Sequence, residues 1–135
     1  MEPRTVSVIV PCRNEAEHIE AFCASVAAQH LWPGWTLEVV IADGMSDDGT
    51  AATLRELARR DPTFIVIDNP RRIVSAGLNL ALQHARGDVI VRMDVHTRYA
   101  PDYVARCLEA LATSGADNVG GPWRAEGETP MQRAV

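Results

Sequence analysis

Short runs of β-branched and aliphatic residues alternate along this sequence with longer segments whose apolar residues recur at helical spacing. The runs predict strands over Thr5–Val10 and Leu37–Ala42. The segments that follow them predict helices over Glu15–Gln29 and from about Thr50. Strands that alternate with helices at this spacing favour right-handed crossovers. The pattern therefore predicts an α/β fold with a doubly wound, mainly parallel sheet.

The same alternation continues through the second half of the sequence. It predicts strands over Phe64–Ile67 and Val89–Met93. It predicts helices over Val74–Ala85 and Tyr103–Leu111. Pro101 is expected in the first turn of the last helix, where a missing backbone N–H is tolerated. A fifth strand is expected to begin around residues 117–120.

Composition excludes several kinds of chemistry. All 13 basic residues are Arg, so a P-loop Lys and a Schiff-base Lys are absent. The net charge of −5 argues against binding nucleic acid or an anionic membrane surface through bulk charge. The three Cys form neither a disulfide framework nor a metal knuckle. No signal peptide or membrane span is indicated, which predicts a soluble, cytoplasmic chain.

Polar residues gather where the predicted strands end. They occupy residues 11–15 after the first strand, 43–48 after the second and 94–96 after the fourth. In a doubly wound sheet, ligands bind outside the carboxyl ends of the strands. The sequence therefore predicts one cleft that these three segments line.

Asp94 and His96 form the first candidate pair. If the chain stays extended here, their side chains leave the strand end on the same side. A carboxylate and an imidazole can hold a divalent ion that bridges a diphosphate. The alternative is that Asp94 caps a turn and His96 faces solvent.

The segment Asp43–Thr50 matches neither a calcium loop nor a serine nucleophile elbow, because the spacing of its ligand and glycine positions is wrong for both. Asp48 or Thr50 is expected to cap the second helix. Asp43, the first residue beyond the strand, is placed to accept from an amide or imide N–H of a ligand.

Two further sites have alternative interpretations. Asn14 and Glu15 can cap the first helix, contact a ligand, or do both. Arg71 and Arg72 form either a solvated pair or a phosphate contact. The GxGxxG dinucleotide fingerprint is absent.

Taken together and in this order, the segments resemble the donor-binding half of a family 2 glycosyltransferase of the GT-A fold. Three segments carry the resemblance: residues 8–15, 40–50 and 86–96. The strings Asn69–Val74 and Met93–His96 are most similar to the succinoglycan-biosynthesis glucosyltransferase subgroup, called ExoA-like. The resemblance covers nearly the whole chain.

The resemblance implies roles for individual residues. It places Pro11, Asn14 and Glu15 in the nucleotide pocket, gives Asp43 the uracil imide and puts Asn79 near the nucleoside. Arg13, Arg72 and Asp94 complete the set of candidate nucleotide-binding residues. Asp94 and His96 occupy the metal-binding DxD positions, with Mn²⁺ or Mg²⁺ as the implied ion.

The chain departs from the family pattern at two positions. His96 stands where a carboxylate is usual, and imidazole is softer than the oxygen ligands that suit Mn²⁺ and Mg²⁺. Leu78 stands where many members carry Arg.

The implied function is that of an inverting enzyme in extracellular polysaccharide biosynthesis. It would transfer a sugar, with glucose expected, from a UDP-sugar to a glycan or lipid-linked acceptor. Residues 1–121 are expected to form the nucleotide-sugar-binding half, and residues 122–135 to begin a truncated acceptor-side region. The general base and any membrane-associated segments are expected beyond Val135, with the full-length protein acting at the inner face of the membrane. The alternatives are a sugar-nucleotide nucleotidyltransferase and a non-catalytic nucleotide-sugar-binding module.

Overall fold

The computed structural model describes residues 4–120 and contains one parallel sheet with helices. In chain order the elements are β1 Arg4–Cys12, α1 Ile19–Ala27, β2 Trp35–Asp43, α2 Thr50–Arg60, β3 Phe64–Asp68, α3 Val74–His84, β4 Val89–Arg92 and α4 Tyr103–Ser114. The strand order is β3-β2-β1-β4, and every pairing is parallel. The predicted doubly wound α/β fold is confirmed.

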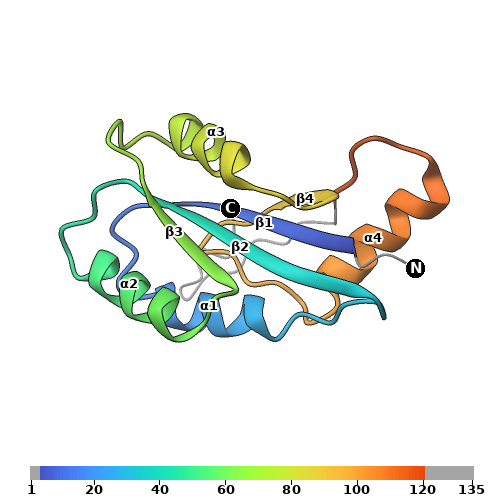
Figure 1. The fold of residues 1–135 in the computed structure, drawn as a ribbon, viewed down its shortest axis with the longest axis horizontal. Helices are drawn as coiled ribbons and strands as arrows, with labels where there is room; N and C mark the ends of the chain where they lie inside the picture. Colours follow the sequence, from blue (N-terminus) through green and yellow to red (C-terminus); the bar gives the residue numbers. More distant parts are fainter. Residues whose placement is uncertain (1–3, 121–135) are drawn as a thin grey trace, which may run out of the picture. The chain divides into compact units, whose positions relative to one another are not determined.

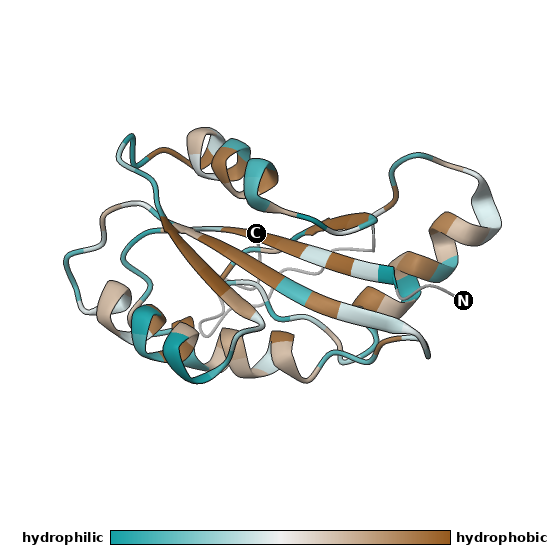
Figure 2. Cartoon of the chain, in the orientation of Figure 1, coloured by the Kyte–Doolittle hydropathy of each residue, from teal (hydrophilic) through white to brown (hydrophobic). Residues whose placement is uncertain are grey.

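Helices cover both faces of the sheet. Figure 1 shows α1 and α2 beneath the strands and α3 above them. Because both faces are covered, the central strands are mostly apolar, and residues 6–10 of β1 and 39–43 of β2 are all buried. Figure 2 shows this as brown along much of the strands. On the α3 side, Ile9, Val40 and Ala81 belong to one buried cluster.

The direction in which successive strands are added to the sheet reverses between β3 and β4. The chain proceeds outward from β1 to β2 and β3, and then returns so that β4 pairs with the other side of β1. In an open α/β sheet, this switch point leaves a crevice at the carboxyl ends of the two strands. The fold therefore places the ends of β1 and β4 where a ligand is expected.

Strand β1 runs two residues further than the sequence predicts, so Pro11 lies inside a central strand. The oxygen of Ile9 accepts from the N–H of Met93 on the β4 side, and that of Cys12 accepts from Gly44 on the β2 side. By this alternation Pro11 faces the β4 side, where β4 has already ended at Arg92. The N–H that proline lacks therefore has no ladder partner to lose.

Three further boundaries differ from the predictions. Helix α1 begins at Ile19, because the oxygen of Glu15 accepts from the N–H groups of His18 and Ile19 in a preceding turn. Pro101 lies before α4, which begins at Tyr103. No strand forms at residues 117–120, so the predicted fifth strand is wrong for this segment.

The chain divides into two compact units, residues 1–105 and 106–135. The first holds the whole sheet and α1 to α3. Of the second, the structure describes the rest of α4 and the residues to 120. Among the described residues, no helix is both long and apolar enough to cross a membrane. The predicted start of an acceptor-side region at residue 122 lies outside the described residues.

Candidate nucleotide-binding site

A pocket of about 150 Å³ opens at the carboxyl ends of the strands. It is lined by the end of β1, the loop between β3 and α3, and the segment after β4; the residues are Pro11, Cys12, Arg13, Glu15, Asn69, Arg72, Ile73, Val74, Asp94, Val95 and His96. Clefts that enclose a complete small-molecule ligand usually measure about 300 to 1,000 Å³. The pocket formed by the described residues is therefore smaller than a cleft that encloses a complete ligand of this kind.

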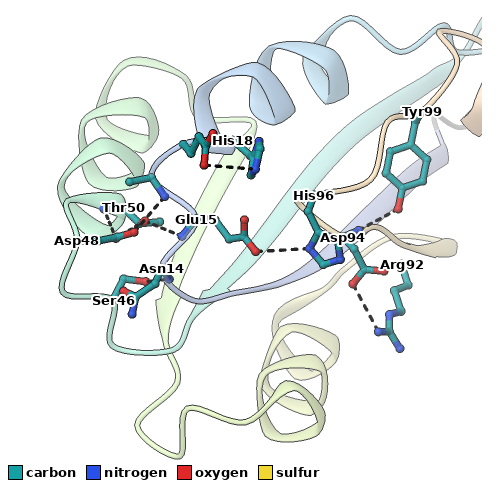
Figure 3. A network of polar contacts seen from close by, with 12 residues as sticks. Asn14, Glu15, His18, Ser46, Asp48, Thr50, Arg92, Asp94, His96 and Tyr99 are labelled. Carbon is teal, nitrogen blue, oxygen red and sulfur yellow. Dashed lines mark hydrogen bonds and ion pairs between the residues drawn. The ribbon is translucent and has the colours of Figure 1, made fainter. Parts of the chain in front are cut away.

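The loop after β1 is held by the loop after β2. The N–H groups of Asn14, Glu15 and Ala16 donate in turn to Ser46 Oγ at 2.8 Å, Thr50 Oγ1 at 3.0 Å and Asp48 Oδ2 at 3.2 Å. In return, Asn14 Oδ1 accepts from the N–H of Asp47 at 2.9 Å. Figure 3 shows this network. It fixes the position from which Glu15 reaches the pocket.

The network corrects the expected helix caps. Asn14 has a left-handed backbone, with φ of 51°, and joins the two loops five residues before α1 begins, so neither it nor Glu15 caps that helix. At α2 the N-cap residue is Gly49, and Asp48 accepts from the N–H and hydroxyl of Thr50, the first helical residue. The Thr50 hydroxyl, together with backbone N–H groups, holds the pKa of Asp48 below its ordinary value.

Asp43 lies at the end of β2 and is 2% exposed. Its Oδ1 accepts from the Ser46 hydroxyl at 2.5 Å, and its Oδ2 accepts from the Ser46 N–H at 3.3 Å. Asp43 does not line the pocket. A carboxylate can accept about four hydrogen bonds, so some of its acceptor capacity remains for a ligand.

Asp94 and His96 both line the pocket, although the chain is not extended between them. Strand β4 ends at Arg92, and the oxygen of Asp94 accepts from the N–H of Thr97 in a turn that contains Val95 and His96. The assumption of an extended chain was therefore wrong. Asp94 Oδ1 lies 3.5 Å from Arg92 Nη2, and the N–H of Asp94 donates to the Tyr99 hydroxyl at 2.9 Å.

Glu15 and His96 approach each other from opposite sides of the pocket. Glu15 Oε1 lies 3.4 Å from His96 Nδ1, as Figure 3 shows. A carboxylate beside one imidazole nitrogen favours the N–H at that nitrogen and leaves the other nitrogen as an acceptor or metal ligand. His96 is 68% exposed, so that second nitrogen is accessible.

Asp94 and His96 offer one carboxylate and one imidazole, which can both ligate a divalent cation but supply only two ligands. No group of three or more His, Cys, Asp or Glu side chains able to hold a metal ion occurs among residues 4–120. A diphosphate and water would have to complete the coordination of an ion at this site. The donor set thus fits a metal that is shared with a phosphorylated ligand.

Two arginines contribute positive charge to the lining. The Arg13 guanidinium donates to the oxygens of Gly44 and Met45, which ties it to the loop after β2. Arg72 has a left-handed backbone with φ of 67°, and its N–H donates to the oxygen of Asn69 at 3.1 Å. With Glu15 and Asp94, the lining carries two formal charges of each sign besides His96.

The pocket brings together most of the predicted site residues and leaves three outside it. Pro11, Arg13, Glu15, Arg72, Asp94 and His96 all line it. Asn14, Asp43 and Asn79 do not, and Asn79 is exposed on α3. Asn69 was missed, although its position directly after β3 is the signal that drew attention to the other strand ends.

Cys12 lines the pocket as a neutral thiol. Burial, with the nearby charges of Asp43 and Glu15, raises the pKa of Cys12 from 9.0 to about 12, and burial does the same for Cys23. Thiolates, not thiols, act as nucleophiles and metal ligands. Cys12 is therefore unsuited to either role near neutral pH.

Alkylation tests this assignment. In the folded chain, iodoacetamide should modify Cys12 and Cys23 slowly at pH 8 and faster only as the pH rises toward 12, while both react readily in urea. Because folding raises both pKa values, the stability that the protonated thiols contribute is complete below about pH 9 and is lost as the pH rises toward 12. Rapid labelling of Cys12 in the folded chain at pH 8 would contradict the assignment.

Comparison with known proteins places this geometry in a family. Residues 7–134 match the model described as "Glycosyl transferase family 2". The succinoglycan biosynthesis protein ExoA of Rhizobium meliloti (strain 1021) is 40% identical over 133 residues, which cover 95% of this chain and 39% of that protein. The chain thus spans about two fifths of the length of this relative.

Solved structures of glycosyltransferases share the fold. A mannosyltransferase from Pyrobaculum calidifontis, in complex with GDP-Man and Mn²⁺, has a TM-score of 0.71 and 34% identity, covering 83% of this chain and 33% of that one. Glucosyl-3-phosphoglycerate synthase from Mycobacterium tuberculosis, with Mn²⁺, UDP and glucosyl-3-phosphoglycerate, has a TM-score of 0.62 and 25% identity, covering 82% and 40%. These neighbours identify the sheet as one of GT-A type.

Proposed function

Because the chain belongs to glycosyltransferase family 2, we propose that it is the donor-binding part of an inverting enzyme that transfers glucose from a UDP-sugar to a glycan or lipid-linked acceptor. One observation carries the proposal. The pocket at the strand switch point combines two arginines with Asp94 and His96, which is a set of groups suited to a diphosphate and a divalent cation.

The similarity to ExoA supports a role in extracellular polysaccharide synthesis. Family membership favours a transferase over a nucleotidyltransferase or a non-catalytic binding module. We place the reaction at the cytoplasmic face of the membrane, in a protein longer than this chain.

In the proposed reaction, the residues of the pocket hold the leaving diphosphate. Asp94 and His96 would ligate Mn²⁺ or Mg²⁺, and Arg72 would contact a phosphate oxygen directly. A bound divalent cation would neutralise the charge that develops on the leaving UDP. Glu15 would orient His96 through the nitrogen that faces it. A carboxylate outside the described residues would take the proton of the acceptor hydroxyl as that oxygen attacks the sugar.

Asp43 would select uracil. Its remaining acceptor capacity can receive the imide N–H, which cytosine lacks. The chain is therefore expected to bind UDP more tightly than CDP. Asp43→Ala should weaken UDP binding by about 1.5 to 3 kcal/mol, roughly 10- to 150-fold, the size of a hydrogen bond to a charged group. Isothermal titration of both nucleotides in Mn²⁺ measures this.

Ser46→Ala is the matched control, because it removes the Ser46 hydroxyl bond to Asp43 but keeps the carboxylate. Equal losses in the two variants would mean that Asp43 only anchors the loop. Equal affinity of the unmodified chain for UDP and CDP would refute uracil selection.

A GDP-sugar is the second candidate donor, favoured by the GDP-Man bound to the Pyrobaculum neighbour. Titration with GDP in the same series separates the two candidates. Tighter binding of GDP than of UDP would replace the uridine assignment and leave the family unchanged.

A further inference from the structure

Asn69 presents an acceptor without a partner at the edge of the pocket. The residue is 3% exposed, lies directly after β3 and lines the pocket. Its Nδ2 donates to the oxygen of Ile73 at 3.0 Å. Its Oδ1 is the one buried side-chain nitrogen or oxygen atom without a hydrogen-bond partner in the described part of the chain. Native proteins rarely leave a buried polar atom without a hydrogen-bond partner, so this atom calls for one.

The orientation of this amide is fixed by its surroundings. If the amide were flipped, Oδ1 would face the Ile73 oxygen, and two acceptors would oppose each other. Nδ2 also packs closely on α3, since a Cβ atom built on Gly77 would lie 3.0 Å from it. The start of α3 therefore occupies the donor side of the amide, and the acceptor Oδ1 on the other side has no partner.

A carbonyl acceptor needs an N–H or O–H from its ligand. A diphosphate offers acceptor oxygens, whereas a nucleoside offers ribose hydroxyls and, in uracil, an imide N–H. The N–H of Asn69 donates to the oxygen of Asp43 at 2.8 Å, so Asn69 lies beside the end of β2. Strands β3 and β4 are three sheet spacings apart, about 14 Å, so Asn69 is on the opposite side of the pocket from Asp94.

We infer that Asn69 Oδ1 accepts a hydrogen bond from the nucleoside of the bound sugar nucleotide, which makes Asn69 a second residue that determines donor specificity. The inference rests on the proposed function, because it takes Asp94 and His96 as the diphosphate end of the site. The hydrogen comes from either the base imide or a ribose hydroxyl.

Titration of ligand analogues against variants tests the inference. The unmodified chain and Asn69→Ala are each titrated in Mn²⁺ with UDP, N3-methyl-UDP, 2′-deoxy-UDP and 3′-deoxy-UDP. The unmodified chain should bind the analogue that lacks the relevant hydrogen about 3- to 10-fold more weakly than UDP. In Asn69→Ala the ratio of the affinity for UDP to the affinity for that analogue should fall to about two or less. The analogue whose ratio collapses identifies the base or the ribose as the donor.

The ratio separates recognition from structure. Loss of the Nδ2 bond to Ile73 would weaken the binding of all four ligands by the same factor. That factor cancels when the affinity for one ligand is divided by the affinity for another. Ser75→Ala, which removes an exposed hydroxyl from the first turn of the same helix, should leave every ratio unchanged. Gly77→Ala should reduce the same ratio by pressing on the Asn69 amide, and it carries the test if Asn69→Ala does not fold.

The possible failures are distinguishable. If the unmodified chain binds no nucleoside diphosphate, the proposed function itself fails. If it binds UDP and every ratio is the same in the unmodified chain and in Asn69→Ala, the role of Asn69 is refuted and the proposed function stands.

Discussion

Asp94→Ala is expected to abolish the effect of Mn²⁺ on UDP binding and to lower the affinity measured in Mn²⁺ by at least about 100-fold. Asp94 is the only carboxylate that the segment after β4 contributes to the described pocket lining. Removing a residue that only supports a metal ligand typically costs about 10- to 100-fold, and removing a direct ligand should cost at least as much.

Arg13 and Arg72, the two arginines of the pocket lining, cannot replace Asp94 as a metal ligand. The Arg13 guanidinium already donates to two backbone oxygens, and a guanidinium such as that of Arg72 has no acceptor atom with which to ligate a metal ion. Calorimetric titration of UDP in Mn²⁺ and in EDTA measures the effect. Asp68→Ala is the matched control, because Asp68 also ends a strand and its exposed ion pair with Arg55 contributes little. Equal responses to EDTA in the unmodified chain and in Asp94→Ala would exclude Asp94 as a ligand.

Two His96 variants complete this test. His96→Ala should weaken Mn²⁺-dependent binding, since it removes the second of two candidate ligands. His96→Asp should retain that dependence, because a carboxylate oxygen suits Mn²⁺ at least as well as imidazole. If His96→Ala binds UDP as the unmodified chain does, His96 is the solvent-facing residue of the alternative interpretation.

The sheet could be predicted because burial on both faces requires continuous apolar runs. Thr5–Val10 and Leu37–Ala42 read as strands without any knowledge of their neighbours. The start of α1 could not be predicted in this way. It depends on a turn at Glu15 that is held by Thr50, a residue 35 positions away, and hydrogen bonds between distant loops leave no periodic signal.

The site was predictable to the extent that strand ends converge. That rule correctly brought Arg13, Asp94 and His96 to one pocket. It could not show that the Ser46 hydroxyl donates a hydrogen bond to the Asp43 carboxylate, or that Val95 and His96 form a turn. Asn69 was not predicted to line the pocket, because its sequence context, Asn-Pro, also suits an ordinary turn.

Gly87→Ala should destabilise the fold by about 3 kcal/mol, at the upper end of the usual cost of overpacking. A Cβ atom at Gly87 would lie 2.4 Å from Ser7 Oγ, 2.7 Å from Ser7 N and 2.8 Å from the oxygen of Thr5. Ser7 is fully buried, and its hydroxyl donates to Glu38 at 2.6 Å while accepting from the Gly87 N–H at 2.7 Å. A shift that relieves the clash would break these partly buried bonds and leave the buried Ser7 hydroxyl with fewer partners.

Urea unfolding followed by circular dichroism should show a midpoint lower by roughly 1 to 3 M, given a usual slope of about 1 to 3 kcal/mol/M. Gly120→Ala is the matched control, since a Cβ atom there would have no heavy atom within 4 Å. Adding Ser7→Ala should not restore stability, because the two close contacts with backbone atoms of Ser7 and Thr5 remain. Recovery in the double variant would place the conflict in the Ser7 side chain alone. An unchanged midpoint in Gly87→Ala would mean that residues 86–88 can move away from β1 at little cost.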